Sequence, residues 1–244
     1  MGFQKTLDNI VVALPIDRQT MMFSATFPEA IESIGRAIAI HPAEPSLHRN
    51  LGFVYQTAAE FTQAVSCFER AIQLAPEDAN AHNELGVALR STKRHETAAD
   101  HLREAIRLQP NVPLFHQNLA EVLGNLEQYE EATSQYEEAI SLAPADAGLK
   151  NGLGVILQAA GKHNEAIDRF REALVAAPNH PLYENNLAAA LQSIGEDEEA
   201  IKHYKNILHR MPESSDTHVN IGNFYLARND LDNAAHHFGL AIKI

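Results

Sequence analysis

The sequence has almost no cysteine, no tryptophan, and far fewer basic than acidic residues. One cysteine, Cys67, stands among 244 residues; it excludes an intramolecular disulfide and is compatible with a reducing compartment. The 19 Lys and Arg against 32 Asp and Glu give a formal net charge of −13. This charge disfavours nucleic acid and anionic membrane surfaces as partners, because both are bound by clustered Lys and Arg.

Long apolar runs are also absent. No segment has the ~20 consecutive apolar residues that a membrane-spanning helix needs. Near the start, Lys5 and the short apolar stretch 10–14 lack the charged start, apolar centre and cleavage site of a secretory signal. We therefore expect a soluble, cytoplasmic protein with no membrane contact.

A period of 34 residues runs through most of the chain. Alanine recurs at this spacing seven times and proline six times. A period of this length indicates a repeat protein built from one supersecondary unit. The alanines are Ala30, Ala64, Ala98, Ala132, Ala166, Ala200 and Ala234, and the prolines are Pro42, Pro76, Pro110, Pro144, Pro178 and Pro212.

Each 34-residue unit contains two apolar segments with helical spacing, at about 46–58 and 62–74 in the first full unit. Small residues such as Gly52 and Ala64 allow the two helices to approach closely. Bulky residues such as Phe68 fill the remaining space. Each second helix is followed by a proline, which cannot continue it. No unit buries its apolar face alone, so the units must stack.

This pattern resembles the tetratricopeptide repeat family over about residues 28–244. The resemblance implies an all-α fold, a right-handed superhelical solenoid of helix-turn-helix repeats, with six full units plus a half unit. Arrays of this kind need a polar cap at their ends, so we expect either a homo-oligomer through an uncapped C-terminal end or a continuation of the chain that covers it. The expected half unit is 28–44, and the full units are 45–78, 79–112, 113–146, 147–180, 181–214 and 215–244.

Residues 1–27 depart from the period and resemble a different family. They are similar to the stretch of DEAD-box RNA helicases that runs from just after the acidic box into the Ser-Ala-Thr motif. The phosphate-binding Gly-x-x-x-x-Gly-Lys-Thr loop and the Asp-Glu-Ala-Asp box of that family are missing from this sequence. We therefore predict a helicase-like remnant at 1–27 without ATP binding, formed by an N-terminal capping helix and an irregular segment. The matching residues are Met1-Gly2-Phe3, Leu14-Pro15, Arg18 to Thr26 and Pro28.

Thirteen histidines raise the possibility of a metal site, but their spacing argues against one. His48, His82 and His116 stand one unit apart, so helix packing separates them by ~8–10 Å or more. Zinc ligands must converge within ~2 Å of one point. The acidic runs fall on exposed helix faces and turns, with no partner for acid–base chemistry. We expect no enzyme activity, no cofactor and no metal.

The first helices carry the informative residues. In the tetratricopeptide family they line the concave face, and by resemblance their inward positions here are rich in amides. The sixth position of the units holds an asparagine series, broken by Glu84 and Gly152. This series looks like the asparagine ladder of O-linked N-acetylglucosamine transferases, which holds extended peptides by their main chain. The candidate peptide-binding residues are Asn50, Asn83, Asn118, Asn151, Asn186, Asn220, Arg49 and Gln117.

Two interpretations of this groove stay open beside the alternative that the asparagines only solvate the surface. The first is a protein–protein interaction scaffold that binds an extended peptide segment in the amide-rich groove. The second is a substrate-recognition arm of a larger enzyme, such as a glycosyltransferase, whose catalytic domain is absent from this chain. Both imply a protein or peptide partner, because asparagine offers the donor and acceptor that complement a peptide unit.

Overall fold

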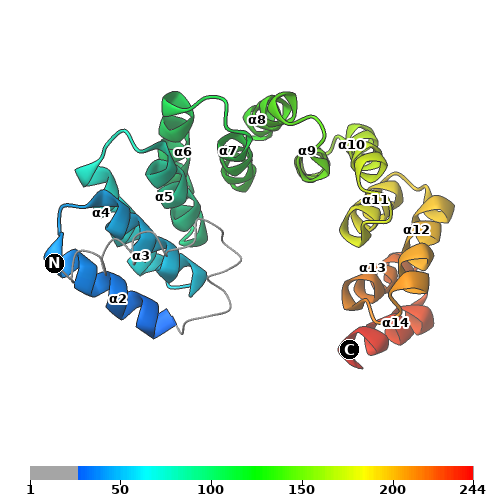
Figure 1. The fold of residues 1–244 in the computed structure, drawn as a ribbon. Coiled ribbons are helices and arrows are strands. Elements are labelled where there is room, and N and C mark those ends of the chain that lie inside the picture. The colour runs from blue at the N-terminus through cyan, green and yellow to red at the C-terminus, as the bar shows by residue number, and fades with distance from the viewer. Residues whose placement is uncertain (1–26, 244) are drawn as a thin grey trace. The chain divides into compact units, whose positions relative to one another are not determined.

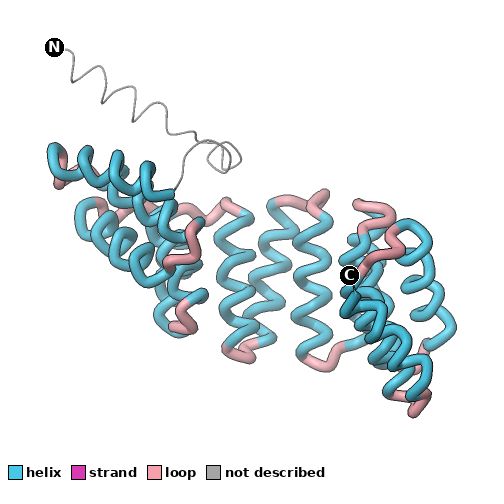
Figure 2. Tube along the Cα trace, turned by 90° about the horizontal axis from the view of Figure 1, so that it is seen from below, coloured by secondary structure: helices cyan, strands magenta, loops and turns pink. Residues whose placement is uncertain are grey.

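The computed structural model describes residues 27–243, and every regular element in this range is an α-helix (Figure 2). The predicted helicase-like remnant and capping helix lie outside the described residues, except for Phe27, where α2 begins. The helices have 12 to 14 residues. None of the helices between residues 27 and 243 is both long and apolar enough to cross a lipid bilayer.

The helices follow one another as antiparallel pairs (Figure 1), and the described residues fall into two compact units that meet between Asn111 and Val112. The all-α repeat fold expected from the period is thereby confirmed, and the first pair begins and ends within one residue of the predicted segments. The division of residues 28–244 into repeat units stays a prediction. The first unit contains α2 (Phe27–Ile40), α3 (Pro45–Thr57), α4 (Phe61–Leu74), α5 (Ala79–Ser91) and α6 (His95–Leu108). The second contains α7 (Pro113–Asn125), α8 (Tyr129–Leu142), α9 (Ala147–Ala159), α10 (His163–Ala176), α11 (Pro181–Ser193), α12 (Asp197–Arg210), α13 (Ser215–Leu226) and α14 (Leu231–Lys243).

The first helix of each pair begins in one of two ways, which alternate along the chain. Proline opens α3, α7 and α11, where its missing N–H costs nothing because the first N–H groups of a helix have no partner. An N-cap side chain precedes the other three. Asp78, Asp146 and Ser214 accept hydrogen bonds from backbone N–H groups of the first turn of α5, α9 and α13.

The turn inside each pair contains one residue in the left-handed conformation, again every 34 residues. The φ angles lie between 59° and 85°. Glycine and asparagine tolerate this conformation, whereas other side chains adopt it at some cost. In this chain the first three positions hold alanine, lysine and glutamate, for which this conformation has a cost. The packing of the two helices therefore sets the conformation of the turn. The residues are Ala59, Lys93, Glu127, Gly161, Gly195 and Asn229.

The core lies between the two helices of each pair and between neighbouring pairs. The periodic alanine of each second helix is at most 2% exposed from Ala64 to Ala234. A large apolar residue follows one turn later on the same helix. In three repeats it is fully buried, as Phe68, Leu102 and Phe170. This ring or branched side chain packs against the small residue of the first helix. At Gly154 an added Cβ would lie 2.5 Å from Cε1 of Phe170.

The last helix, α14, leaves large apolar side chains in solvent. Leu231 is 60% exposed and Ile242 is 86% exposed, whereas the periodic Ala234 of the same helix is buried against α13. Exposed apolar patches of this kind commonly mark interfaces. Homo-oligomerisation through this end stays a prediction.

Candidate functional site

In the second unit, the fifth- and sixth-position asparagines bond to one another from one first helix to the next. Nδ2 of Asn186 on α11 donates to Oδ1 of Asn151 on α9 at 2.8 Å. One repeat later, Nδ2 of Asn220 on α13 donates to Oδ1 of Asn185 on α11 at 3.3 Å. We call these four residues the amide ladder. It joins α9, α11 and α13, which follow one another along one side of the unit (Figure 1).

The two rows of the ladder differ in exposure. Asn151 and Asn185 are each 8% exposed, and Asn185 also bonds to the Thr217 hydroxyl at 3.2 Å. Asn186 and Asn220 are half-buried. The buried row therefore supports the structure by satisfying polar groups between the helices. The outer row is the part of the ladder that a ligand can reach.

The outer amides keep hydrogen-bonding capacity that the ladder does not use. An asparagine side chain has two N–H donors and an oxygen with two lone pairs. Asn186 and Asn220 each spend one donor on the ladder, which also restricts the orientation of the amide. A second N–H and the Oδ1 atom remain at each position. This is the complement of one peptide unit, with one acceptor and one donor.

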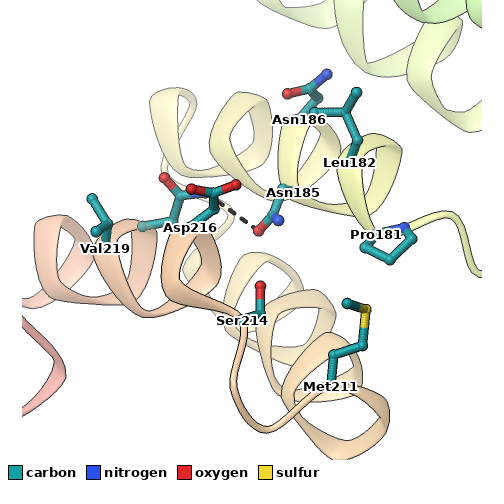
Figure 3. A pocket seen from close by; sticks show the side chains of 9 residues that line it. Pro181, Leu182, Asn185, Asn186, Met211, Ser214, Asp216 and Val219 are labelled. Carbon is teal, nitrogen blue, oxygen red and sulfur yellow. Dashed lines mark hydrogen bonds between the residues drawn. The ribbon is translucent and has the colours of Figure 1, made fainter. Parts of the chain in front are cut away.

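A pocket lies beside these amides, between α11, α13 and the loop that precedes α13 (Figure 3). Its volume is about 420 Å³, within the range of ~300–1,000 Å³ typical of ligand pockets. Apolar atoms make up most of its lining surface, and Asp216 is the one charged residue that lines it. It is lined by Pro181, Leu182, Asn185, Asn186, Met211, Ser214, Asp216, Val219 and Asn220.

The remaining predicted site residues of the second unit do not line this pocket. Gln117 on α7 is half-buried, and its Nε2 donates to Oε1 of Glu121 at 3.0 Å. Asn118, also on α7, is 8% exposed. Asn151 is 8% exposed, and its Oδ1 accepts the hydrogen bond from Asn186.

The first unit contains the other three predicted residues. Arg49 on α3 forms an ion pair with the N-cap residue Asp78, with 2.8 Å between Nη1 and Oδ2. Asn50 on the same helix is half-buried, and Asn83 on α5 is 4% exposed. This ion pair joins the Arg49 side chain of α3 to the N-cap of the next first helix, α5, and peptide binding by Arg49 stays a prediction.

One of the two breaks in the asparagine series has a steric explanation. Tyr136 of α8 lies directly over the sixth position of the next repeat, Gly152. A Cβ built there would lie 2.5 Å from the tyrosine Oη. Tyr136 is 3% exposed, so the ring has no room to withdraw. Asparagine is excluded at this position by its neighbour.

The recurring histidines of the first helices act as hydrogen-bonding residues of the core. Nε2 of His82 lies 3.0 Å from the carbonyl oxygen of Pro76, and Nε2 of His218 lies 3.1 Å from that of Pro212. A carbonyl only accepts, so Nε2 carries the proton. These contacts satisfy the proline carbonyls that follow the second helices α4 and α12. The sequence indicated packing positions but gave no sign of this partner.

The second ring nitrogen of these histidines meets a side chain of the paired second helix. Nδ1 of His82 lies 3.1 Å from Nδ1 of His101, and Nδ1 of His218 lies 3.0 Å from Nδ1 of His237. Burial, followed by the neighbouring histidine, lowers the pKa of His101 and of His237. In the repeat after that of His82, Oε1 of Gln135 lies 2.8 Å from Nδ1 of His116. Across residues 27–243, three or more His, Cys, Asp or Glu side chains do not converge as a metal site would require.

Cys67 is half-buried on α4, and burial raises the pKa of its thiol to about 11. At neutral pH it is protonated, and a thiol in that state is a poor nucleophile. It behaves as a small apolar residue of the helix.

Sequence reasoning missed the apolar half of the pocket. Leu182 is the second residue of α11, Met211 follows α12, and Val219 occupies the fifth position of α13. Val219 breaks the run of amides at its position, which is the one signal that the sequence contained. Met211 and Ser214 lie in a loop, where the repeat pattern does not predict the direction in which a side chain points.

Comparison with known proteins agrees with this architecture. Three family models described as tetratricopeptide repeat match residues 54–113, 115–146 and 145–213. A solved structure from Parabacteroides merdae, described as a tetratricopeptide repeat protein, superposes with a TM-score of 0.77. It has 15% identity and covers 89% of this chain and 86% of that one. PilF of Pseudomonas aeruginosa gives a TM-score of 0.65 with 22% identity, covering 79% and 88%.

A third solved structure is similar over a comparable part of the chain. YrrB, described as a TPR protein with an unusual peptide-binding site, gives a TM-score of 0.60 with 20% identity and covers 77% of this chain and 97% of that one. At these identities the structures show the fold alone.

Among curated proteins the matches are short and fall on ATP-dependent RNA helicases. Dbp4 of Schizosaccharomyces pombe is 46% identical over 50 residues, which are 20% of this chain and 7% of that protein. Human DDX46, described as a probable ATP-dependent RNA helicase, is 50% identical over 44 residues, 18% and 4%. The chain thus spans well under a tenth of these helicases, which confirms a partial helicase resemblance. The repeat models, by contrast, extend from residue 54 to residue 213, more than half of the sequence. Together with the paired helices and the 34-residue period, they show that the chain belongs to the tetratricopeptide repeat proteins.

Proposed function

We propose that this chain is a protein-interaction scaffold that binds an extended peptide segment along the first helices of its second unit. Tetratricopeptide repeats generally serve as protein-binding scaffolds, and the proposal assigns no reaction to the chain. The observation that carries it is the outer row of the amide ladder. Asn186 and Asn220 are oriented by their bonds to the previous repeat and keep a donor and an acceptor free beside a pocket.

The spacing of the ladder supports an extended ligand. Asn186 and Asn220 sit on consecutive first helices, and helices pack ~8–10 Å apart. Consecutive side chains on the same face of an extended peptide are ~6.6 Å apart, and each residue adds ~3.3 Å. Two or three residues of extended main chain therefore bridge the two amides. A helical ligand, rising only ~1.5 Å per residue with its amides already bonded, offers them nothing to bind.

The binding contribution of the ladder can be bounded. A net hydrogen bond stabilises a complex by ~0.5–1.5 kcal/mol. Loss of both outer amides therefore weakens binding by ~1–3 kcal/mol, which is about fivefold to 150-fold in affinity. YrrB, whose description names a peptide-binding site, shares this fold and supports the same class of ligand.

The test uses a phage-displayed library of random 12-residue peptides selected on the immobilised chain. A selected peptide is labelled and its affinity is measured by fluorescence anisotropy. We expect Asn186→Ala combined with Asn220→Ala to weaken binding about fivefold or more. N-methylation of single backbone amides in the peptide should weaken it comparably, because the amides contact main chain.

The matched control is Asn164→Ala, an exposed asparagine on the second helix α10. It should leave the affinity unchanged. Circular dichroism confirms that both variants are folded, which matters because Asn151 and Asn185 each lose a partner in the double variant. Parent-like affinity in the folded double variant would show that the outer amides do not bind peptide.

A further inference from the structure

We propose that the pocket between α11 and α13 selects peptides that contain a large apolar residue with a lysine or arginine within two positions of it. This rests on the proposed function and adds the sequence preference of the same site. The apolar side chain enters the pocket, and the basic side chain pairs with Asp216 at its edge. Figure 3 shows these residues around one pocket: Asp216 and Val219 lie on one side of it, and Leu182 and Met211 lie on other sides.

The apolar part of the preference follows from exposure. Leu182 is 55% exposed, Met211 is 48% exposed and Val219 is 39% exposed. Single exposed apolar residues are ordinary on a protein surface, but here three of them, from two helices and a loop, line one pocket. Burying an apolar ligand side chain against them removes apolar surface from water on both partners. The cavity of about 420 Å³ has room for a side chain of leucine or phenylalanine size.

The basic part follows from charge. Asp216 is exposed at the second position of α13 and forms no ion pair with any residue in the range 27–243. The neighbouring cation is already occupied, because the Arg210 guanidinium pairs with the buried Glu184 and donates to the carbonyl oxygen of Asn179. Glu213, one residue before the pocket residue Ser214, is also exposed. The pocket therefore presents the Asp216 carboxylate without an ion-pair partner among the described residues.

The ladder fixes how the two preferences are arranged along the ligand. In an extended peptide, neighbouring side chains point to opposite sides and every second one shares a side. A main chain held by Asn186 and Asn220 directs one side chain into the pocket, which the same asparagines line. Asp216 lies one helical turn before Asn220 on α13. It follows the pocket residue Met211 by five positions in the sequence. A basic residue next to the apolar one, or two along, is within reach of its carboxylate.

The experiment compares peptide pools selected from the same random 12-residue phage library on the full chain and on its Asp216→Asn variant. The pool selected on the parent should be enriched in Lys or Arg within two positions of Leu, Ile, Met, Val or Phe. The pool selected on Asp216→Asn should keep the apolar residue and lose the basic one. For one peptide from the parent pool, Asp216→Asn should weaken binding about threefold, the size of an exposed ion pair. This effect should shrink at 0.5 M NaCl because salt screens exposed charges.

Two matched variants separate the parts of the site. Asp168→Asn removes an exposed carboxylate from α10 and changes the net charge equally, so it should leave affinity and selected pool unchanged. Met211→Ser combined with Val219→Ser should weaken binding of the same peptide about tenfold, because apolar contact is lost.

The outcomes distinguish this inference from the function on which it rests. In one outcome, the selected peptides depend on Asn186 and Asn220 for binding but show no basic enrichment, or show the same enrichment on both proteins. That outcome would overturn the sequence preference and leave the scaffold function standing. A basic enrichment that Asp168→Asn also abolishes would assign the effect to net charge and likewise overturn it. Peptides that bind independently of both asparagines would overturn the proposed function itself.

Discussion

At the scale of single residues, the repeat is held by contacts between a small residue on the first helix and a large one on the second. Gly52, Gly86, Gly154 and Gly222 each face such a partner, and a built Cβ would lie 2.5 to 2.7 Å from it. Real Cβ atoms do not approach neighbours so closely, so the helices would have to separate. Glycine here allows close approach of two helices, at the cost of lower helix propensity.

We predict that Gly154→Ala lowers the free energy of unfolding relative to Gly35→Ala by about 1–3 kcal/mol, the usual cost of overpacking a core. Both glycines are helical, so the gain of about 1 kcal/mol in helix propensity is common to the two variants. A Cβ at Gly35 meets nothing within 4 Å, whereas at Gly154 it meets the fully buried ring of Phe170. Urea unfolding followed by circular dichroism measures the difference. Equal stability of the two variants would mean that the α9–α10 contact yields without cost.

At the scale of helix pairs, two histidine contacts connect the first and second helices and make the fold sensitive to pH. His82 and His101 join α5 to α6, and His218 and His237 join α13 to α14. Each pair accommodates one proton between its facing nitrogens and opposes a second positive charge. The groups acting on His101 are His82 and Arg94, which lower its pKa, and Asp100 and Glu69, which raise it, with burial the largest cause. At His237, burial is followed by His218 and His236.

We predict that the chain loses stability as the pH falls below about 6.5, the ordinary pKa of histidine. Because the folded-state pKa values of His101 and His237 are lowered, the unfolded chain binds more protons in this window, and stability rises with pH. The variant carrying His101→Gln and His237→Gln should lose less stability between pH 7.5 and 5. Gln135 already occupies the equivalent position beside His116, so the substitution copies a native contact. Thermal unfolding at both pH values measures the effect, and an identical pH response of parent and variant would contradict it.

At the scale of the whole molecule, the chain consists of two compact units, and the candidate site lies wholly inside the second. The amide ladder and the pocket use residues between Asn151 and Asn220 only. In repeat proteins each repeat is stabilised by its immediate neighbours. The second unit, with eight helices in consecutive pairs, thus contains the contacts that its own site requires.

We predict that residues 112–244, expressed alone, remain helical and bind a selected peptide within about twofold of the full chain, since the ladder and pocket are retained intact. Residues 1–111 alone should be helical and should not bind that peptide. Circular dichroism and fluorescence anisotropy provide the two measurements. Loss of helical signal in 112–244 would mean that the second unit depends on the first, and binding by 1–111 would place the site elsewhere.

The sequence alone determined the helices, their pairing and the identity of the core. A strict 34-residue period with alanine, proline and a large apolar residue in fixed positions can be satisfied only by stacked helix pairs, because each side chain in the pattern needs the same neighbour in every unit. It also located the asparagines on the first helices.

Only the tertiary structure decided which of those asparagines are accessible and what the other residues do. Asn151 and Asn185 are buried and accept hydrogen bonds from the next first helix, whereas Asn186 and Asn220 keep free donors and acceptors. Arg49 is held by Asp78, and the left-handed turns at Ala59, Lys93 and Glu127 are imposed without a glycine signal. The physical reason is that a periodic pattern specifies local conformation and burial, whereas hydrogen-bond partners and pockets depend on which side chains meet across two repeats. Those distances are set by packing and are not encoded in any one unit.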